Sequence, residues 1–258
     1  MKKLWKQLLY ITIIFFILLN KKLYSQNDDL INNPELAFGF EIASQTKYLW
    51  HGLPLDNGFV MQPDLWFSYD NFTIEFWGNY VVNDKSSFDS TRNHEFDIYL
   101  YYDFSLTENI SIQPKLNYYK YLYEEFTPST MELSLSLDYK INDYLTIKNE
   151  IYADVLNYKG ISYGAHLLEF FKELNNYLQI KSTAGIIWGN KKFFDTNFEI
   201  SKDLNISHFQ LYLEILYHIS ENFSVVPFID YYLESDHKLR SLYKENLINS
   251  GIKVQFEL

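Results

Sequence analysis

The sequence predicts a closed antiparallel β-barrel of about 12 membrane-crossing strands, preceded by a signal peptide. Three observations predict this fold class. Apolar residues recur at every second position over most of the chain. The connections between these stretches alternate between short turns and long polar loops. Aromatic residues make up 19% of the 258 residues, which is about double the share in an ordinary soluble domain.

Composition excludes several classes of protein. The chain contains no cysteine, so it has no disulfide scaffold, thiolate metal site or cysteine nucleophile. Its 22 basic and 33 acidic side chains give a net charge of -11, which argues against a nucleic-acid partner because phosphate binding needs clustered Lys and Arg. The six histidines show no metal-ligand spacing, and no phosphate loop or nucleophile elbow is present. We therefore expect neither a metal nor a cofactor.

The first 25 residues have the pattern of a secretory signal peptide. Lys2, Lys3 and Lys6 precede an apolar run over residues 8–19, which is shorter than the roughly 20 residues of a transmembrane helix. We expect cleavage after Ser25, with an uncleaved anchor as the alternative. Removal of residues 1–25 takes away five lysines and no acids, which leaves 17 basic against 33 acidic side chains and a net charge of -16. Residues 26–35 then form a short periplasmic segment.

Residues 36–258 form the predicted barrel. In each expected strand, apolar side chains at alternate positions are separated by polar ones, as in Phe72, Ile74 and Phe76, so each strand has one apolar and one polar face. The alternation is weakest over residues 162–172. Twelve segments follow this rule, at residues 36–50, 58–69, 72–83, 93–106, 109–123, 130–141, 144–156, 162–172, 177–189, 207–219, 223–234 and 246–258.

The connections indicate which end of the barrel is which. Short ones are rich in Asn, Asp and Glu, which suit tight hairpin turns, as at residues 70–71, 108–109, 142–143, 175–176 and 221–222. Longer polar ones span residues 51–57, 83–92, 190–206 and 235–245. Short periplasmic turns and long extracellular loops are typical of outer-membrane barrels, and an even strand number puts both termini on the periplasmic side.

A soluble sandwich or ligand-binding barrel would also alternate. Twelve long strands enclose a space too wide for one layer of side chains, so the polar face is expected to line water. Aromatic residues also gather near the strand ends, where membrane barrels carry interfacial girdles. These are Tyr48, Trp50, Phe59, Trp66, Tyr69, Phe72, Tyr80, Tyr118, Tyr144, Tyr177, Trp188 and Phe223.

The opening strands resemble a known family. Thr46-Lys47-Tyr48-Leu49-Trp50-His51-Gly52-Leu53, then Gly58, Gln62-Pro63 and Trp77-Gly78-Asn79, look like the first strands of the TorF family of porins, whose first hairpin carries an S-x-Y-x-W-R-G-type motif. The resemblance implies a Gram-negative outer-membrane barrel with porin function, and Tyr48, Trp50, His51 and Gly52 are the motif positions. His51 stands where the family usually has Arg, which puts a charge role there in doubt.

Strand parity assigns a set of side chains to the lumen. We expect the pore to be lined by the charged residues Glu75, Glu95, Asp97, Asp103, Lys115, Glu132, Asp138, Lys148 and Glu150 and by Tyr99, Tyr101, Tyr119 and Tyr121. By the same parity Glu41, Lys47, Asp64, Lys140, Asp154, Lys181, Glu214, Asp230 and Lys253 also face inward, so acids outnumber bases by 12 to 6. A net negative wall in a narrow aqueous passage favours cations. The alternative is that these acids pair with the lysines across strands.

The sequence therefore predicts a passive channel for small hydrophilic solutes in the cell outer membrane, possessing no catalytic residues. Its expected partners are the lipid bilayer, the barrel-assembly machinery and the solutes themselves. Two alternatives stay open. A non-conducting barrel could bind a partner through its extracellular loops, since the tyrosines or the loop over residues 190–206 could fill the lumen. A lipid-active enzyme could use Ser162 or Ser182 with His166.

Overall fold

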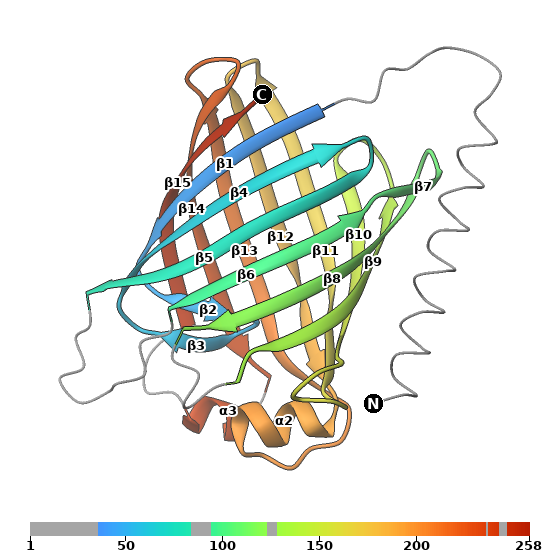
Figure 1. Cartoon of the computed structure of the whole chain (residues 1–258), viewed down its shortest axis with the longest axis vertical. Helices are drawn as coiled ribbons and strands as arrows, with labels where there is room; N and C mark the ends of the chain where they lie inside the picture. The colour runs from blue at the N-terminus through green and yellow to red at the C-terminus, as the bar shows by residue number, and fades with distance from the viewer. Residues whose placement is uncertain (1–35, 84–93, 123–127, 236, 243–246) are drawn as a thin grey trace. The chain divides into compact units, whose positions relative to one another are not determined.

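The structure, a computed structural model, describes residues 36–83, 94–122, 128–235, 237–242 and 247–258, which form a closed antiparallel β-barrel (Figure 1). The expected signal peptide and the segment 26–35 lie outside the described residues. The barrel strands are β1 (Leu36–Gln45), β4 (Phe59–Tyr69), β5 (Phe72–Asn83), β6 (Glu95–Tyr102), β7 (Phe104–Thr107), β8 (Ile110–Tyr121), β9 (Thr130–Lys140), β10 (Leu145–Asp154), β11 (Ser162–Asn175), β12 (Leu178–Gly189), β13 (Asn205–His218), β14 (Phe223–Glu234) and β15 (Leu247–Glu257).

The barrel closes because, in the described part of the chain, the first and last barrel strands pair with each other: β1 pairs with β15, with Gly39 opposite Glu257. The other barrel strands pair in chain order, apart from β6 and β7, which do not pair with each other. Both β6 and β7 pair with β8 and are separated only by Asp103, so together they make one crossing. The barrel therefore has 12 crossings, which confirms the predicted fold class.

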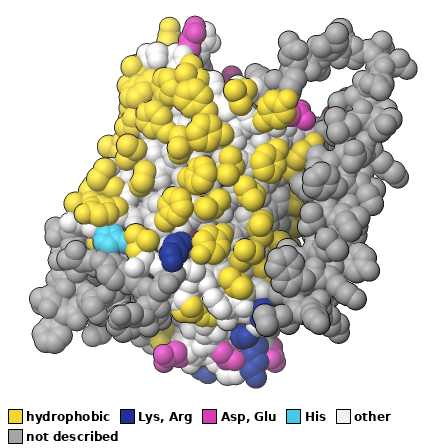
Figure 2. All heavy atoms as spheres, in the orientation of Figure 1, with side chains coloured by type: hydrophobic (Ala, Val, Ile, Leu, Met, Phe, Trp, Pro, Cys, Tyr) yellow, Lys and Arg dark blue, Asp and Glu magenta, His cyan; other side chains and the backbone are white. Residues whose placement is uncertain are grey.

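Alternation gives the barrel wall two different faces. On β9 Leu133, Leu135 and Leu137 are exposed, whereas Glu132, one position before Leu133, is buried and lines an interior cavity. Exposed apolar residues of the same kind lie on the other strands, and in Figure 2 hydrophobic side chains cover much of the outer strand surface while charged ones gather at the end that carries the helices. An apolar outer band is what a bilayer requires of a barrel.

At one end of the barrel, which we call the turn end, the strands are joined by short turns that local hydrogen bonds hold. Asn142 Oδ1 accepts hydrogen bonds from the backbone N–H groups of Tyr144 and Leu145, at 2.8 and 3.0 Å, and Asn175 Oδ1 accepts one from Tyr177 at 2.9 Å. These contacts confirm the predicted hairpin turns. A girdle of exposed aromatic residues surrounds this end, made up of Tyr69, Phe72, Tyr139, Tyr144, Tyr177 and Tyr217.

The opposite end differs from the sequence expectation in three places. The first predicted strand, 36–50, ends at Gln45, and a separate hairpin follows, made of β2 (Tyr48–Trp50) and β3 (Leu53–Asp56). The expected loop 190–206 contains helix α2 (Lys191–Phe198), and the loop 235–245 contains α3 (His237–Leu242). At the turn end, the weakest predicted strand, 162–172, continues to Asn175, with a shift in its register against β12 between Glu173 and Asn175. No helix in the described part of the chain is long and apolar enough to cross a membrane.

We expect Leu135→Arg to cost about 2–4 kcal/mol of folding free energy, because it places a cation on the lipid face of β9. Ser136→Arg, one position along and lining an interior cavity, is the matched control and should cost much less. Urea titrations of refolding into lipid vesicles would measure both. Equal costs for the two variants would contradict the assignment of the faces.

Candidate functional site

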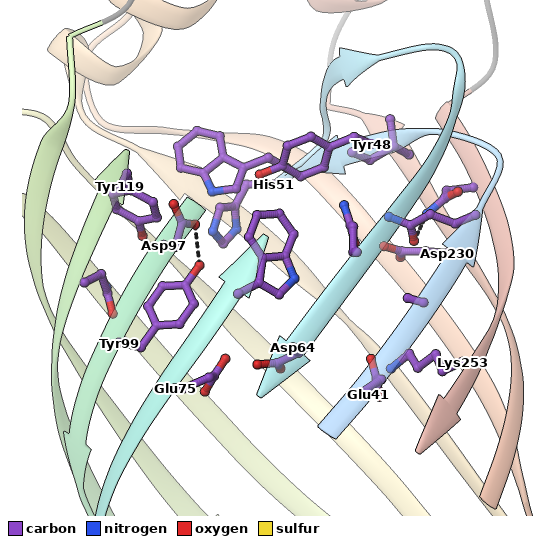
Figure 3. A pocket seen from close by; sticks show the side chains of 18 of the residues that line it. Glu41, Tyr48, His51, Asp64, Glu75, Asp97, Tyr99, Tyr119, Asp230 and Lys253 are labelled. Carbon is purple, nitrogen blue, oxygen red and sulfur yellow. Dashed lines mark hydrogen bonds between the residues drawn. The ribbon is translucent and has the colours of Figure 1, made fainter. Parts of the chain in front are cut away.

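The interior of the barrel contains a cavity of about 470 Å³, which we call the lumen cavity (Figure 3). Strands β1, β4, β5, β6, β8, β10, β13, β14 and β15 line it together with the β2–β3 hairpin. Five carboxylates and two lysines face it. They are Glu41, Asp64, Glu75, Asp97 and Asp230, and Lys115 and Lys253.

A second cavity of about 260 Å³, the cap cavity, lies between the hairpin, α2 and the wall of β6, β8, β9 and β10. Its charged lining consists of Glu95, Glu132 and Asp154, without Lys or Arg among the described lining residues. Tyr48 and Tyr119, with Trp50, line both cavities. A solute moving from one cavity to the other would therefore pass these three rings.

A third cavity of about 120 Å³ lies near the turn end of the barrel, and four predicted pore residues line it: Asp103, Asp138, Lys148 and Glu150. Every predicted pore residue except Tyr101 lines one of the three cavities. The Tyr101 ring lies under Lys115 Nζ, which is 4.5 Å from the ring centroid. Among the other residues assigned to the lumen by parity, Glu41, Asp64, Asp154, Asp230 and Lys253 also line a cavity.

Tyrosines hold the carboxylates on the β6–β9 side of the lumen. Tyr99 donates to Asp97 at 2.7 Å, and Tyr48 donates to Glu95 at 2.9 Å. Tyr119 and Tyr163 donate to the same Glu132 oxygen at 2.9 and 2.7 Å. Hydrogen bonds to ionised acceptors are the stronger kind, and a buried carboxylate without a partner would be costly. The aromatic lining therefore fixes the positions of the acids as well as filling space.

Lysines hold the carboxylates on the other side. Lys148 Nζ lies 3.7 Å from Asp138 and 3.4 Å from Glu169, and Lys181 Nζ lies 3.2 Å from Glu169. Lys253 Nζ lies 3.2 Å from Glu214. Cross-strand ion pairing, the alternative raised by the sequence, thus applies to this side, where tyrosines also contribute, since Tyr212 donates a hydrogen bond to Glu214 and Tyr152 donates one to Glu150.

Sequence reasoning missed Glu169, Tyr163 and Asn117 as lumen residues. Glu169 and Tyr163 share the inward face of β11 with Ala165 and Leu167, and those apolar neighbours obscured the alternation. Strict parity over the whole strand would have found both. Asn117 faces inward between Lys115 and Tyr119, and the same parity places it there.

The hairpin at the mouth of the barrel is a tight two-residue turn. Trp50 pairs with Leu53, and His51 and Gly52 between them have φ angles of 48° and 83°. Two positive φ angles define the type I′ turn, which suits β-hairpins, and His is among the residues that tolerate this conformation. A Cβ on Gly52 would lie 2.6 Å from the His208 ring, so both the conformation and the space require glycine.

Interior contacts hold this hairpin inside the barrel. Asn249 Oδ1 of β15 accepts from Thr46 Oγ1 and from the Lys47 backbone N–H, each at 3.1 Å. The Trp50 ring packs edge-on against Tyr163 at 5.2 Å. Tyr48 is almost completely buried and packs on Trp77 at 5.6 Å. The assignment of Tyr48 and Trp50 to an interfacial girdle was therefore wrong, because both rings lie inside the barrel.

Helix α2 covers the hairpin from outside. Asn190 caps it by accepting a hydrogen bond from the Phe193 backbone N–H at 2.9 Å and donating one to Gly160 O at 2.7 Å. Phe193 and Phe194 are fully buried, and Phe193 stacks on Tyr163 at 5.1 Å. We call this packed group the cap cluster, consisting of Leu53, Ile161, Tyr163, Phe193, Phe194, Phe198 and Leu239.

His51 lies among aromatic rings, with ring centroids of Trp50 and Tyr163 at 4.9 Å and of Tyr152 at 5.5 Å. Burial in these surroundings lowers the pKa of His51 from 6.5 to about 4. The imidazole is therefore neutral at neutral pH, and this position carries no charge there.

The histidine named for the enzyme alternative has a different partner. His166 Nδ1 lies 2.8 Å from Asn149 Oδ1, on β10 and β11, and its ring stacks near Trp188 at 6.2 Å. Among the described residues no group of three or more His, Cys, Asp or Glu side chains could hold a metal ion.

The fold is that of the outer-membrane porins. It is similar to the NanC porin, with a TM-score of 0.54 and 10% identity over 85% of this chain and 100% of that one. It is also similar to the KdgM porin, with a TM-score of 0.52 and 8% identity over 85% of this chain and 98% of that one. At these identities the likeness shows the fold alone.

No protein-family model matches the chain, and no curated protein matches it. The resemblance to the TorF family therefore stays a prediction. The motif positions do have a structural role here, because Tyr48, Trp50, His51 and Gly52 form the hairpin that lies in the mouth of the barrel.

We expect Gly52→Ala to release the hairpin, because it adds strain at a positive φ of about 1–2 kcal/mol and a clash with the His208 ring. Hydrogen–deuterium exchange over residues 46–57 should become faster. Gly160→Ala is the matched control: Gly160 also has a positive φ, of 92°, but a Cβ there would meet Lys192 at an ordinary 3.5 Å. Unchanged protection of residues 46–57 in Gly52→Ala would contradict this role.

Acid should also loosen the hairpin. Burial of the hairpin inside the barrel lowers the pKa of His51 to about 4. The buried position of the hairpin is therefore fully stabilised above pH 6.5, and it loses about 1–3 kcal/mol of stability as the pH falls from 6.5 to 4. Exchange protection factors of residues 46–57 at pH 7.5 and 4.5 would measure this loss. His208 is the other base near His51. His51→Asn, which keeps the turn but does not titrate, should lose less protection in acid than the wild type.

Proposed function

We propose that this protein is a channel of the outer membrane that passes small hydrophilic solutes and prefers cations. The observation that carries the proposal is the lining of the lumen and cap cavities, where carboxylates outnumber lysines throughout. Walls of one sign in a narrow passage focus the electrostatic potential and raise the local concentration of the opposite charge. Solutes would diffuse passively, and no cofactor takes part.

The mouth of the barrel favours small solutes. The β2–β3 hairpin and the cap cluster fill part of the mouth, and the path that we propose for the solute runs past Tyr48, Trp50 and Tyr119, which line both the lumen and the cap cavity. One structure of the KdgM porin is a complex with oligogalacturonate, a chain of acidic sugars. The acid-rich lining and the filled mouth of the present barrel suit neither the charge nor the size of such a ligand.

The proposed location and partners follow from the same features. The apolar outer band and the aromatic girdle suit insertion in the outer membrane, with the bilayer as the permanent partner. Strand β15, which carries Val254 and Phe256 and runs to Glu257, supplies the apolar terminal strand on which we expect the barrel-assembly machinery to act.

The cap cluster favours a second candidate function, a non-conducting barrel that acts through its extracellular side. Phe193, Phe194 and Leu239 are completely buried over the mouth, and α2 and α3 would then be part of a binding surface. Conductance separates the two candidates, because a barrel with a permanently closed mouth gives no current.

We expect protein extracted from the outer membrane of an expression host to show a defined unit conductance in planar bilayers, with a reversal potential that indicates cation preference under a salt gradient. Glu75→Gln combined with Asp97→Asn should reduce the cation-to-anion permeability ratio by about two- to tenfold, since two of the five carboxylates of the lumen cavity are neutralised. Asp138→Asn should have a smaller effect, because Asp138 is paired with Lys148.

Asp143→Asn is the matched control for this measurement. Asp143 lies on a turn, with its side chain 86% exposed and 3.0 Å from Lys140, so its neutralisation should leave selectivity unchanged. Folded protein without conductance would refute the channel and favour the second candidate. Conductance with unchanged selectivity in the double variant would refute the cation preference alone.

A further inference from the structure

We propose that the lumen cavity is a binding site for a small organic cation that carries N–H donors, such as an alkyl diamine. The proposal rests on the proposed function and deepens it by naming the class of solute. It would make the barrel a selective channel, with a site where the solute pauses during its passage.

Three oxygen atoms around the cavity lack a hydrogen-bond partner. Asp64 Oδ1, Asp97 Oδ1 and Asn117 Oδ1 are buried and unpartnered among the described residues, and all three residues line the lumen cavity. Asp97 and Asn117 are each only 1% exposed. Buried acceptors without a donor are costly and call for a partner. All three are acceptors, so the missing partner is a donor.

The remaining atoms of two of these residues hold them in place. Asp97 Oδ2 accepts from Tyr99 at 2.7 Å, as the dashed line in Figure 3 shows. Asn117 Nδ2 donates to Ser134 Oγ at 3.2 Å, which directs the amide oxygen away from that donor. The open acceptors are therefore fixed in position before any solute arrives.

An aromatic ring lies between the acceptors. In the strand register, Trp77 of β5 is opposite Asp64 of β4 on one side and Asp97 of β6 on the other, and all three line the cavity. On the next strand, Asn117 is opposite Tyr99. An ammonium group near an aromatic face and close to carboxylates gains both cation–π and hydrogen-bond interactions. A Trp flanked by two carboxylates is thus suited to an alkylammonium ion.

The lysines of the cavity have other contacts. Lys253 pairs with Glu214 at 3.2 Å, and Lys115 Nζ lies over the rings of Tyr101 and Tyr99, at 4.5 and 5.6 Å. Neither donates a hydrogen bond to the open oxygens of Asp64 and Asp97. The lysines of the cavity therefore leave those acceptors without a partner.

An organic cation fits this site better than a metal ion. Among the described residues no group of three or more His, Cys, Asp or Glu side chains has an arrangement that could hold a metal. The volume of about 470 Å³ falls within the range of small-molecule sites, and the aromatic lining is typical of them. Dispersed acceptors around such a volume suit a molecule with donors at more than one point.

The test is equilibrium binding to the full protein in detergent micelles, measured by titration calorimetry at fixed salt. The probes are putrescine, which has an ammonium group at each end of a four-carbon chain; succinate, which has carboxylates at the same spacing; and tetramethylammonium, a cation without N–H groups. We expect putrescine to bind, succinate not to bind, and tetramethylammonium to bind at least about tenfold more weakly, since it cannot donate to the open oxygens.

Two variants test the residues separately. Asp97→Asn and Asp64→Asn each keep the side-chain shape and should each weaken putrescine about tenfold, so either one serves if the other does not fold. Asp143→Asn, on the exposed turn, should bind putrescine as the wild type does. Equal affinity for putrescine and tetramethylammonium, or unchanged affinity in the folded Asp variants, would overturn the site.

This measurement can fail independently of the proposed channel. A protein that conducts potassium ions but does not bind putrescine overturns the site and leaves the channel intact. A protein that binds putrescine but gives no conductance in planar bilayers keeps the site and overturns the channel. Putrescine should also block the potassium current of the wild type more strongly than that of Asp97→Asn.

Discussion

The hydrogen bonds between β1 and β15 are the interactions on which the rest of the structure depends. In a bilayer, every backbone N–H and C=O group of a spanning strand must find a partner within the protein. The register from Gly39 opposite Glu257 to Gln45 opposite Gly251 supplies those partners for the two strands that are terminal in the described chain. Without this closure the sheet would expose two polar edges to lipid, and there would be no interior in which a site could form.

Closure also explains the composition of the interior. The apolar face of each strand is used on the outside, so the interior receives the polar face, with its Asp, Glu, Lys and Tyr side chains. These groups are removed from bulk water and hold one another, through tyrosine hydrogen bonds at Glu132 and through lysine pairs at Glu169. The hairpin and α2 then cover part of the interior with aromatic rings, and their contacts decide how much of the lumen stays open.

Alternation predicted the barrel well because a strand that separates lipid from a polar interior must alternate. The same rule could not predict the hairpin. Tyr48 and Trp50 continue the period of β1, so they resembled the end of a strand, and the His51-Gly52 turn signal lay in a stretch interpreted as a loop. Helix α2 was not predicted for a similar reason, because three buried Phe residues among its eight residues do not define a helical period. Both elements depend on contacts with distant strands, which local pattern does not encode. Most of the expected pore residues follow parity and line the cavities, whereas the open oxygens of Asp64, Asp97 and Asn117 depend on side-chain geometry.

The pairing of β1 with β15 has a consequence for how the barrel is made. Its side-chain bond from Gln255 to Glu41 joins residues 214 positions apart, and such contacts make assembly slow because a long stretch of chain must be ordered first. Until β15 is in place, β1 presents a free edge that can pair with another chain. Biogenesis therefore requires that this edge be held by something else until the last strand arrives, and chains that stop short of Leu247 should aggregate rather than insert.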